Sequence, residues 1–220
     1  LSLLAAHLVA VPAGQRGTGQ ILAYDTAPSG KPGSEYNYSN PGYVLLGMLI
    51  EKVTGKPMAT VLRRDLAKPA GLERAAFQDV ERPQPPIAED RNFVCGNGVD
   101  GFLPCRAIAS LSAANSGLAA DAPTVARWGY QLYGGRVVPA EVVGQMTAGD
   151  GEYGLGTMLF SLSLGLETAV GHTGDMPDYT SLMVAVPEKK VSIAILLADG
   201  NKSVKTVAAE LLRAVQQALG

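Results

Sequence analysis

YSNPGYVLLGMLIEKVTG, residues 38–55, is the stretch of the chain that decides its fold. A polar residue followed by proline predicts a helix that starts at Asn40-Pro41, with the Asn40 side chain as N-cap, and Gly55 predicts its end. Nearly every residue from Gly42 to Val53 is apolar. A helix that is apolar nearly all round is typical of the centre of a domain, so we predict a buried helix here.

The elements on either side divide the chain into a helical part and a part with strands. Further helices are predicted at Met58–Ala67, from the cap Asp121 through Leu132 to Gly134-Gly135, and from Pro139 to Met146. After Gly151 the pattern changes, and strands are predicted at Tyr153–Leu164, Tyr179–Val186 and Val191–Ala198. Val204–Leu219 has the spacing of an amphipathic helix that covers a sheet. We therefore predict an α+β fold, with a helical region at 1–150 and three antiparallel strands and a covering helix at 151–220.

Composition excludes several classes of protein. The chain of 220 residues is 47% hydrophobic and 17% charged, which is typical of a folded globular protein. Its net charge is −2 and its basic residues are spread singly, which argues against nucleic acids and anionic membranes as partners. No apolar run is long enough to span a bilayer. The apolar residues 1–13 lack the basic flank of a signal peptide, so we expect a chain that begins inside a longer protein, with His7 in a structural role.

Cys95 and Cys105 are the two cysteines of the chain, and they flank a glycine-rich loop. Such a loop can bring two thiols within bridging distance, and one disulfide suits an exported protein, which is the localisation we expect. The alternative is two free thiols in a cytosolic protein. Zinc is not expected, because there is no further cysteine and there are two histidines far away.

Two short motifs carry the chemistry. Tyr38-Ser39-Asn40 precedes the apolar helix, and Gly171-His172-Thr173-Gly174-Asp175 lies far downstream. In this order they resemble the second and third motifs of the class C β-lactamase and DD-peptidase family, the penicillin-recognising serine hydrolases. The stretches 115–118, 122–135 and 153–156 look like those that join the motifs in the family. The resemblance covers nearly all of the chain from Lys31 onward.

The resemblance implies a role for each motif residue. Tyr38 would act as general base once a lysine ammonium makes its phenolate accessible, and Asn40 would hydrogen-bond the substrate and that lysine. His172-Thr173-Gly174 would bind substrate ahead of the strand that begins near Tyr179, and the Asp175 amide would donate to the oxyanion. His172 stands where many relatives have lysine, which would make binding of a substrate carboxylate pH-dependent. The alternatives are a mere N-cap for Asn40, a packed aromatic ring for Tyr38 and a solvated or capping histidine.

The nucleophile of this chemistry is not in the chain. It normally comes from a Ser-x-x-Lys turn, and no lysine here has a serine three residues before it. The chain therefore looks like the C-terminal part of a serine hydrolase that acts on an amide, ester or β-lactam through an acyl-enzyme. Its N-terminal strands and nucleophile helix would belong to its own missing segment or to a second chain. The expected partner is a small-molecule or peptide substrate, with no cofactor and no metal. The alternative is a non-catalytic module that binds a peptide or partner along an open sheet edge.

Overall fold

The computed structural model describes residues 31, 33, 36–88, 114–149, 151–160, 168–176, 179–199 and 202–219. The chain forms two compact units. The first, called here the helical unit, comprises residues 1–64, 76–85 and 95–119, and the second, the sheet unit, comprises residues 65–75, 86–94 and 120–220. This division differs from the predicted boundary at residue 150, because the helices of residues 122–147 belong to the sheet unit. Each unit is described by itself.

The helical unit is built around helix α3, Asn40–Thr54. The helix ends where the sequence predicts: Gly55 is left-handed, with φ +65°, and its N–H donates to the Glu51 carbonyl at 2.8 Å. The predicted second helix is confirmed as α4, Met58–Leu62, which continues into the π-helical turn η1, Arg63–Ala67, whose residues 65–67 are counted in the sheet unit. Strands β1, Ala76–Phe77, and β2, Leu118–Ala119, form a short antiparallel pair.

The prediction that α3 is buried on all sides is wrong. Val44 and Gly47 are its buried residues, and a Cβ on Gly47 would collide with Ala114 and press on Met58. Four of its apolar side chains are between 52% and 76% exposed: Leu45, Leu46, Leu49 and Val53. An apolar side chain is buried only where another element covers it, and within the described part of the helical unit the covering residues lie on the Gly47 side of α3.

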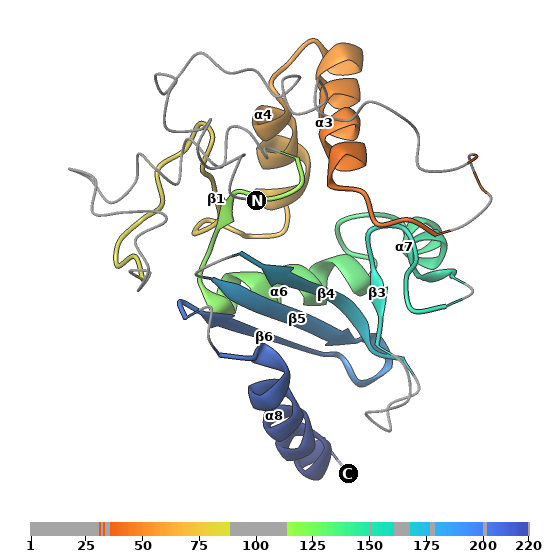
Figure 1. Cartoon of the computed structure of the whole chain (residues 1–220), viewed down its shortest axis with the longest axis vertical. Coiled ribbons are helices and arrows are strands. Elements are labelled where there is room, and N and C mark those ends of the chain that lie inside the picture. The colour runs from red at the N-terminus through yellow and green to blue at the C-terminus, as the bar shows by residue number, and fades with distance from the viewer. Residues whose placement is uncertain are drawn as a thin grey trace. The chain divides into compact units, whose positions relative to one another are not determined.

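The sheet unit contains a four-stranded antiparallel sheet in the order β3-β4-β5-β6 (Figure 1). Its strands are β3, Met158–Leu159, β4, Val170–Asp175, β5, Thr180–Val186, and β6, Val191–Leu197. The predicted strands of residues 179–186 and 191–198 are confirmed as β5 and β6. Of the predicted strand of residues 153–164, the structure describes residues 153–160, and β3 lies among them. The prediction of three strands is wrong, because the His-Thr-Gly motif does not precede a strand but forms one, β4.

Helices lie on both faces of the sheet, which explains why β5 is apolar without a break from Leu182 to Val186. Its residues alternate between two clusters. Leu182, Val184 and Val186 pack with Val204 and Ala208 of α8, Val204–Leu219. Met183 and Ala185 pack with Leu132 and Tyr133 of α6, Ala122–Tyr133. In Figure 1, α6 lies behind the strands and α8 follows β6.

Both helices that cover the α6 side of the sheet start as the sequence predicts. The Asp121 carboxylate caps α6 by accepting from the Thr124 N–H at 2.9 Å, and it also pairs with the Arg74 guanidinium at 2.7 Å. Helix α7, Ala140–Thr147, begins directly after Pro139. Within the described ranges, no helix has both the length and the apolar character required to cross a membrane.

Candidate functional site

Ser39, and not Asn40, caps helix α3, which corrects the prediction for Asn40. The Ser39 hydroxyl accepts from the Gly42 N–H at 3.0 Å, while Asn40 is the first helical residue and Pro41 the second. Sequence alone does not separate two adjacent residues that are both good caps. Because Ser39 supplies the cap, the reading of Asn40 as a cap alone is wrong, and its exposed amide is not needed to start the helix.

Tyr38 lies just before this cap and is 49% exposed. Partial burial raises the pKa of its phenol above the usual value, and the neighbouring Tyr43 and Tyr36 add to the effect by repelling a phenolate. A raised pKa makes a phenol a weaker source of phenolate at neutral pH. The family role of a general base calls for a cation near Tyr38, because burial, Tyr43 and Tyr36 all raise the pKa of its phenol.

The His-Thr-Gly motif occupies β4, which pairs with β5 along its whole length, from Val170 opposite Ala185 to Asp175 opposite Thr180. Pairing with β3 is shorter and reaches from Val170 to Gly171. In the described part of the sheet, residues 172–175 therefore extend beyond the register of β3. This half of β4 has the geometry of an edge strand.

The backbone N–H groups of this edge alternate in direction. Met176 donates its N–H to the Tyr179 carbonyl at 2.9 Å, which places residues 176 and 179 in a hydrogen-bonded pair. In an antiparallel ladder the next residue along, Asp175, then directs its N–H away from β5, and so does Thr173. The two N–H groups point to the side on which the register of β3 has already ended.

His172 is hydrogen-bonded through both ring nitrogens. Its Nε2 lies 2.7 Å from the Tyr153 hydroxyl oxygen, and its Nδ1 lies 2.5 Å from the Thr173 carbonyl oxygen. The Tyr153 and His172 rings meet edge to face, with centroids 5.6 Å apart and planes at 87°. His172 is thus neither solvated at both nitrogens nor a helix cap.

Tyr153 was not predicted as a site residue. It lies 19 residues before His172, and the turn that carries it leads into β3, whose Met158 pairs with Gly171 beside the histidine. The signal in the sequence was the resemblance of residues 153–156 to a joining stretch of the family, which indicates position but not contact.

The predicted site residues are divided between the two units. Tyr38 and Asn40 belong to the helical unit, and His172, Thr173, Gly174 and Asp175 belong to the sheet unit. The structure brings together the members of each motif. Cys95 and Cys105, the possible disulfide, lie outside the described residues, so their pairing stays a prediction.

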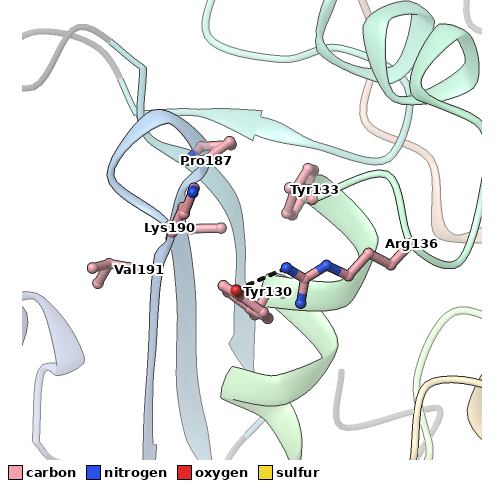
Figure 2. Close-up of a pocket in the computed structure, with 9 residues that line it drawn as sticks. Tyr130, Tyr133, Arg136, Pro187, Lys190 and Val191 are labelled. Atoms are coloured by element: carbon pink, nitrogen blue, oxygen red, sulfur yellow. Dashed lines mark hydrogen bonds between the residues drawn. The ribbon is translucent and has the colours of Figure 1, made fainter.

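A separate cavity of about 150 Å³ lies elsewhere in the sheet unit (Figure 2). It is lined by residues of α6, β5, η3 (Pro187–Lys189) and β6 and by their connections. At its rim the Arg136 guanidinium lies 4.4 Å above the Tyr130 ring centroid and donates to the Tyr130 hydroxyl at 3.0 Å. None of the lining residues belongs to the two motifs.

Solved structures of amide hydrolases share this fold. A D-stereospecific amidohydrolase from Streptomyces superposes with a TM-score of 0.69 at 25% identity, and the match covers 86% of this chain and 58% of that one. A D-amino acid amidase from Ochrobactrum anthropi SV3 gives a TM-score of 0.74 at 20% identity, over 96% of this chain and 66% of that one. This chain therefore spans less than two thirds of these two hydrolases.

Comparison of sequences also finds similar proteins, each matched over about a third of this chain. A protein described as "Putative D-alanyl-D-alanine carboxypeptidase" from Escherichia coli K12 is 34% identical over 76 residues, which are 33% of this chain and 17% of that protein. An N-acetylmuramyl-L-alanine amidase from Bacillus subtilis is 32% identical over 71 residues, or 32% of this chain and 16% of the amidase. Residues 5–217 match the family described as Beta-lactamase, which confirms the resemblance noted in the sequence and accounts for the α+β fold. The chain belongs to the beta-lactamase family.

Proposed function

We propose that this chain is part of a serine hydrolase that cleaves an amide bond next to a D-amino acid by way of an acyl-enzyme. Support for the reaction type comes from the family and the two motifs. Support for the substrate class comes from the names of the similar proteins, which include a D-stereospecific amidohydrolase, a D-amino acid amidase and a D-alanyl-D-alanine carboxypeptidase. We infer that the serine and lysine of the Ser-x-x-Lys turn come from a segment outside these 220 residues, because no such pair is present in them.

In the proposed reaction Tyr38 transfers the proton, and the backbone N–H groups of β4 bind the oxyanion. The serine oxygen adds to the substrate carbonyl, and its proton passes to the phenolate of Tyr38, which a neighbouring lysine ammonium keeps accessible. When the tetrahedral adduct collapses, the C–N bond breaks, and Tyr38 returns the proton to the leaving nitrogen. Water then hydrolyses the serine ester and releases the acid. Asn40 holds the substrate amide through its side chain, which the cap by Ser39 leaves unused.

The observation that carries the proposal is the direction of the β4 backbone. The Thr173 and Asp175 N–H groups point away from β5 at the stretch where pairing with β3 has ended. Such groups suit both an extended substrate and the oxyanion of a tetrahedral adduct, and removing one oxyanion donor typically costs about 10²–10³ in turnover. Gly174 allows β4 and β5 to lie close together at this point, because a Cβ there would collide with the Ser181 hydroxyl.

The test is stereoselective hydrolysis by a protein that includes a Ser-x-x-Lys segment upstream of Leu1. Release of ammonia from D-alanine amide and of alanine from D-alanyl-D-alanine is compared with release from the L-forms, with a chromogenic β-lactam and an ester as further substrates. We expect faster hydrolysis of the D-amides. Equal rates for both enantiomers would refute the substrate class. Binding of a peptide without turnover of any of these compounds would favour the non-catalytic module.

A further inference from the structure

We propose that Tyr153 is the positioning residue of His172. Its hydroxyl group donates a hydrogen bond to Nε2 and thereby holds the imidazole in the tautomer that carries its proton on Nδ1. The catalytic meaning of this contact rests on the proposed function, in which His172 takes part in substrate binding. Tyr153 and His172 both belong to the sheet unit, so the hydrogen bond between them is tested without any assay of hydrolysis.

The partners of the two ring nitrogens fix the direction of the hydrogen bonds. Nδ1 of His172 lies against the Thr173 carbonyl oxygen, and a carbonyl oxygen can only accept, so Nδ1 carries the proton. In a neutral imidazole the other nitrogen then has a lone pair and can only accept. The group at 2.7 Å from Nε2 is the Tyr153 hydroxyl, which can donate. The Tyr153 hydroxyl therefore donates this hydrogen bond, and Nε2 of His172 accepts it.

The turn that carries Tyr153 is held by contacts that do not involve the histidine. Leu155 donates its N–H to the Met146 carbonyl at the end of α7, at 2.9 Å. Thr157 is completely buried, and its hydroxyl lies 3.2 Å from the Tyr133 hydroxyl on α6. Two helices thus fix the turn on either side of its apex. Because the turn is held in place, its Tyr153 hydroxyl can orient a neighbouring ring.

The strand side of the contact is equally constrained. His172 follows Gly171, which pairs with both Met158 and Val184 and has no room for a side chain, because a Cβ there would run into the Met183 carbonyl. The histidine backbone is thereby fixed in the sheet. The edge-to-face packing of the two rings limits rotation of the imidazole about its own axis. The Tyr153 hydroxyl therefore determines which ring nitrogen of His172 carries the proton. It is not needed to hold β4 in place.

The experiment observes the ring nitrogens of His172 directly in the full chain. The chain has two histidines, so labelling with ¹⁵N-histidine gives two imidazoles, and a His7→Gln variant assigns them. Spectra are recorded at about pH 9, well above the pKa of about 6.5 of a free imidazole. We expect Nδ1 of His172 to be protonated and the Nε2 signal to be displaced by an accepted hydrogen bond. In Tyr153→Phe the displacement is lost, and the ratio of Nδ1–H to Nε2–H tautomers falls about fivefold, as expected for one hydrogen bond of ordinary net strength.

Tyr133→Phe is the matched control. It removes a hydroxyl from the contacts of the same turn, through Thr157, without removing the donor to His172. We expect the His172 signals of this variant to match those of the unsubstituted chain. Equal changes in both variants would overturn the proposal, because they would attribute the effect to packing of the turn. A protonated Nε2 in the unsubstituted chain would overturn it as well.

A kinetic measurement separates this inference from the proposed function. In a protein that includes the nucleophile segment, Tyr153→Phe is expected to raise KM for D-alanyl-D-alanine about fivefold and to leave kcat nearly unchanged. Hydrolysis that is absent in the unsubstituted protein, beside the expected NMR signature, refutes the proposed function alone. Active hydrolysis beside a His172 spectrum that Tyr153→Phe leaves unchanged refutes the positioning role alone.

Discussion

Tyr38 shows how far a single residue can be assigned from its surroundings. Burial and two neighbouring tyrosines raise the pKa of its phenol, which is the opposite of what a general base needs. A lysine ammonium at hydrogen-bond distance would reverse the sign, because an opposite charge within about 4–6 Å favours the charged form. The catalytic role of Tyr38 is thus conditional on one positive charge. The resemblance to the family already implies this lysine, whereas the raised pKa could not be seen in the motif, which records residue types but not their electrostatic environment.

The substitution Tyr38→Phe tests that role. In a protein that includes the Ser-x-x-Lys segment we expect acylation to fall by roughly two to four powers of ten, the usual contribution of a general base. Folding and binding of a non-reactive substrate analogue should barely change, because the ring is retained. Pre-steady-state release from a chromogenic ester measures the acylation step. Near-normal turnover in the variant would remove Tyr38 from the mechanism.

Ser39 and Asn40 form a pair of neighbours whose roles can be separated. Ser39→Ala removes the cap of α3 and is expected to cost about 0.5–2 kcal/mol of stability, with a smaller effect on turnover. Asn40→Ala keeps the cap hydrogen bond, so it should leave the urea midpoint nearly unchanged and lower turnover instead. The two variants are compared by urea unfolding and by hydrolysis of the same substrate. A larger loss of stability in Asn40→Ala than in Ser39→Ala would contradict the assignment.

The two cysteines allow a prediction from sequence alone. If the protein is exported, Cys95 and Cys105 should form a disulfide. Intact mass after alkylation, with and without prior reduction, counts the free thiols. Alkylation of both cysteines without a reductant would exclude the bridge and weaken the proposed export.

Helix α6 carries a pH-dependent contribution at its N-terminus. The pKa of the Asp121 carboxyl lies below its usual range, and the hydrogen bond with the Thr124 side chain is the largest cause. The Thr124 backbone N–H and the Arg74 guanidinium lower the pKa further, while burial opposes them. A lowered pKa in the folded state gives stability that is present above the unfolded pKa of about 3.9 and is lost as the pH falls through the folded pKa.

Asp121→Asn isolates the charge, because asparagine remains a good cap. Since the carboxylate is partly exposed, we expect a loss of less than about 1 kcal/mol at pH 7. The difference from the unsubstituted chain should shrink in urea unfolding once the pH is well below the unfolded pKa of about 3.9, because the carboxylate of the folded state then becomes protonated. A difference that persists unchanged at that pH would show that the charge of Asp121 does not matter.

Elements with a strong local pattern were predicted well, and those that depend on neighbours were not. Helix α3 and strand β5 have local signals, a proline after a polar residue and a run of apolar residues. Strand β4 contains Gly171 and Gly174 and lacks apolar alternation, so it is a strand because β5 pairs with it along its whole length. The burial of α3 and the contact of Tyr153 with His172 depend on tertiary packing, which no window of sequence contains.

At the scale of the whole molecule, the absence of Ser-x-x-Lys leads to a prediction for the chain as it stands. We expect the 220 residues alone to form no stoichiometric adduct with a fluorescent penicillin, because neither Ser39 nor any other serine has a lysine at the required spacing. Co-expression with a segment that carries Ser-x-x-Lys should restore labelling. Gel fluorescence and peptide mass spectrometry measure the adduct. Stoichiometric labelling of one serine in the isolated chain would identify a different nucleophile.

The close approach of the backbone around Tyr153 and His172 also determines where this protein can be diversified in the laboratory. Gly154 lies against the Met146 carbonyl and Gly171 against the Met183 carbonyl, so any larger residue at either position would have to displace a main chain. Leu155, two residues after Tyr153, is 66% exposed, and Met176, just beyond β4, is 38% exposed. A combinatorial library aimed at new substrates would keep both glycines and randomise positions 155 and 176.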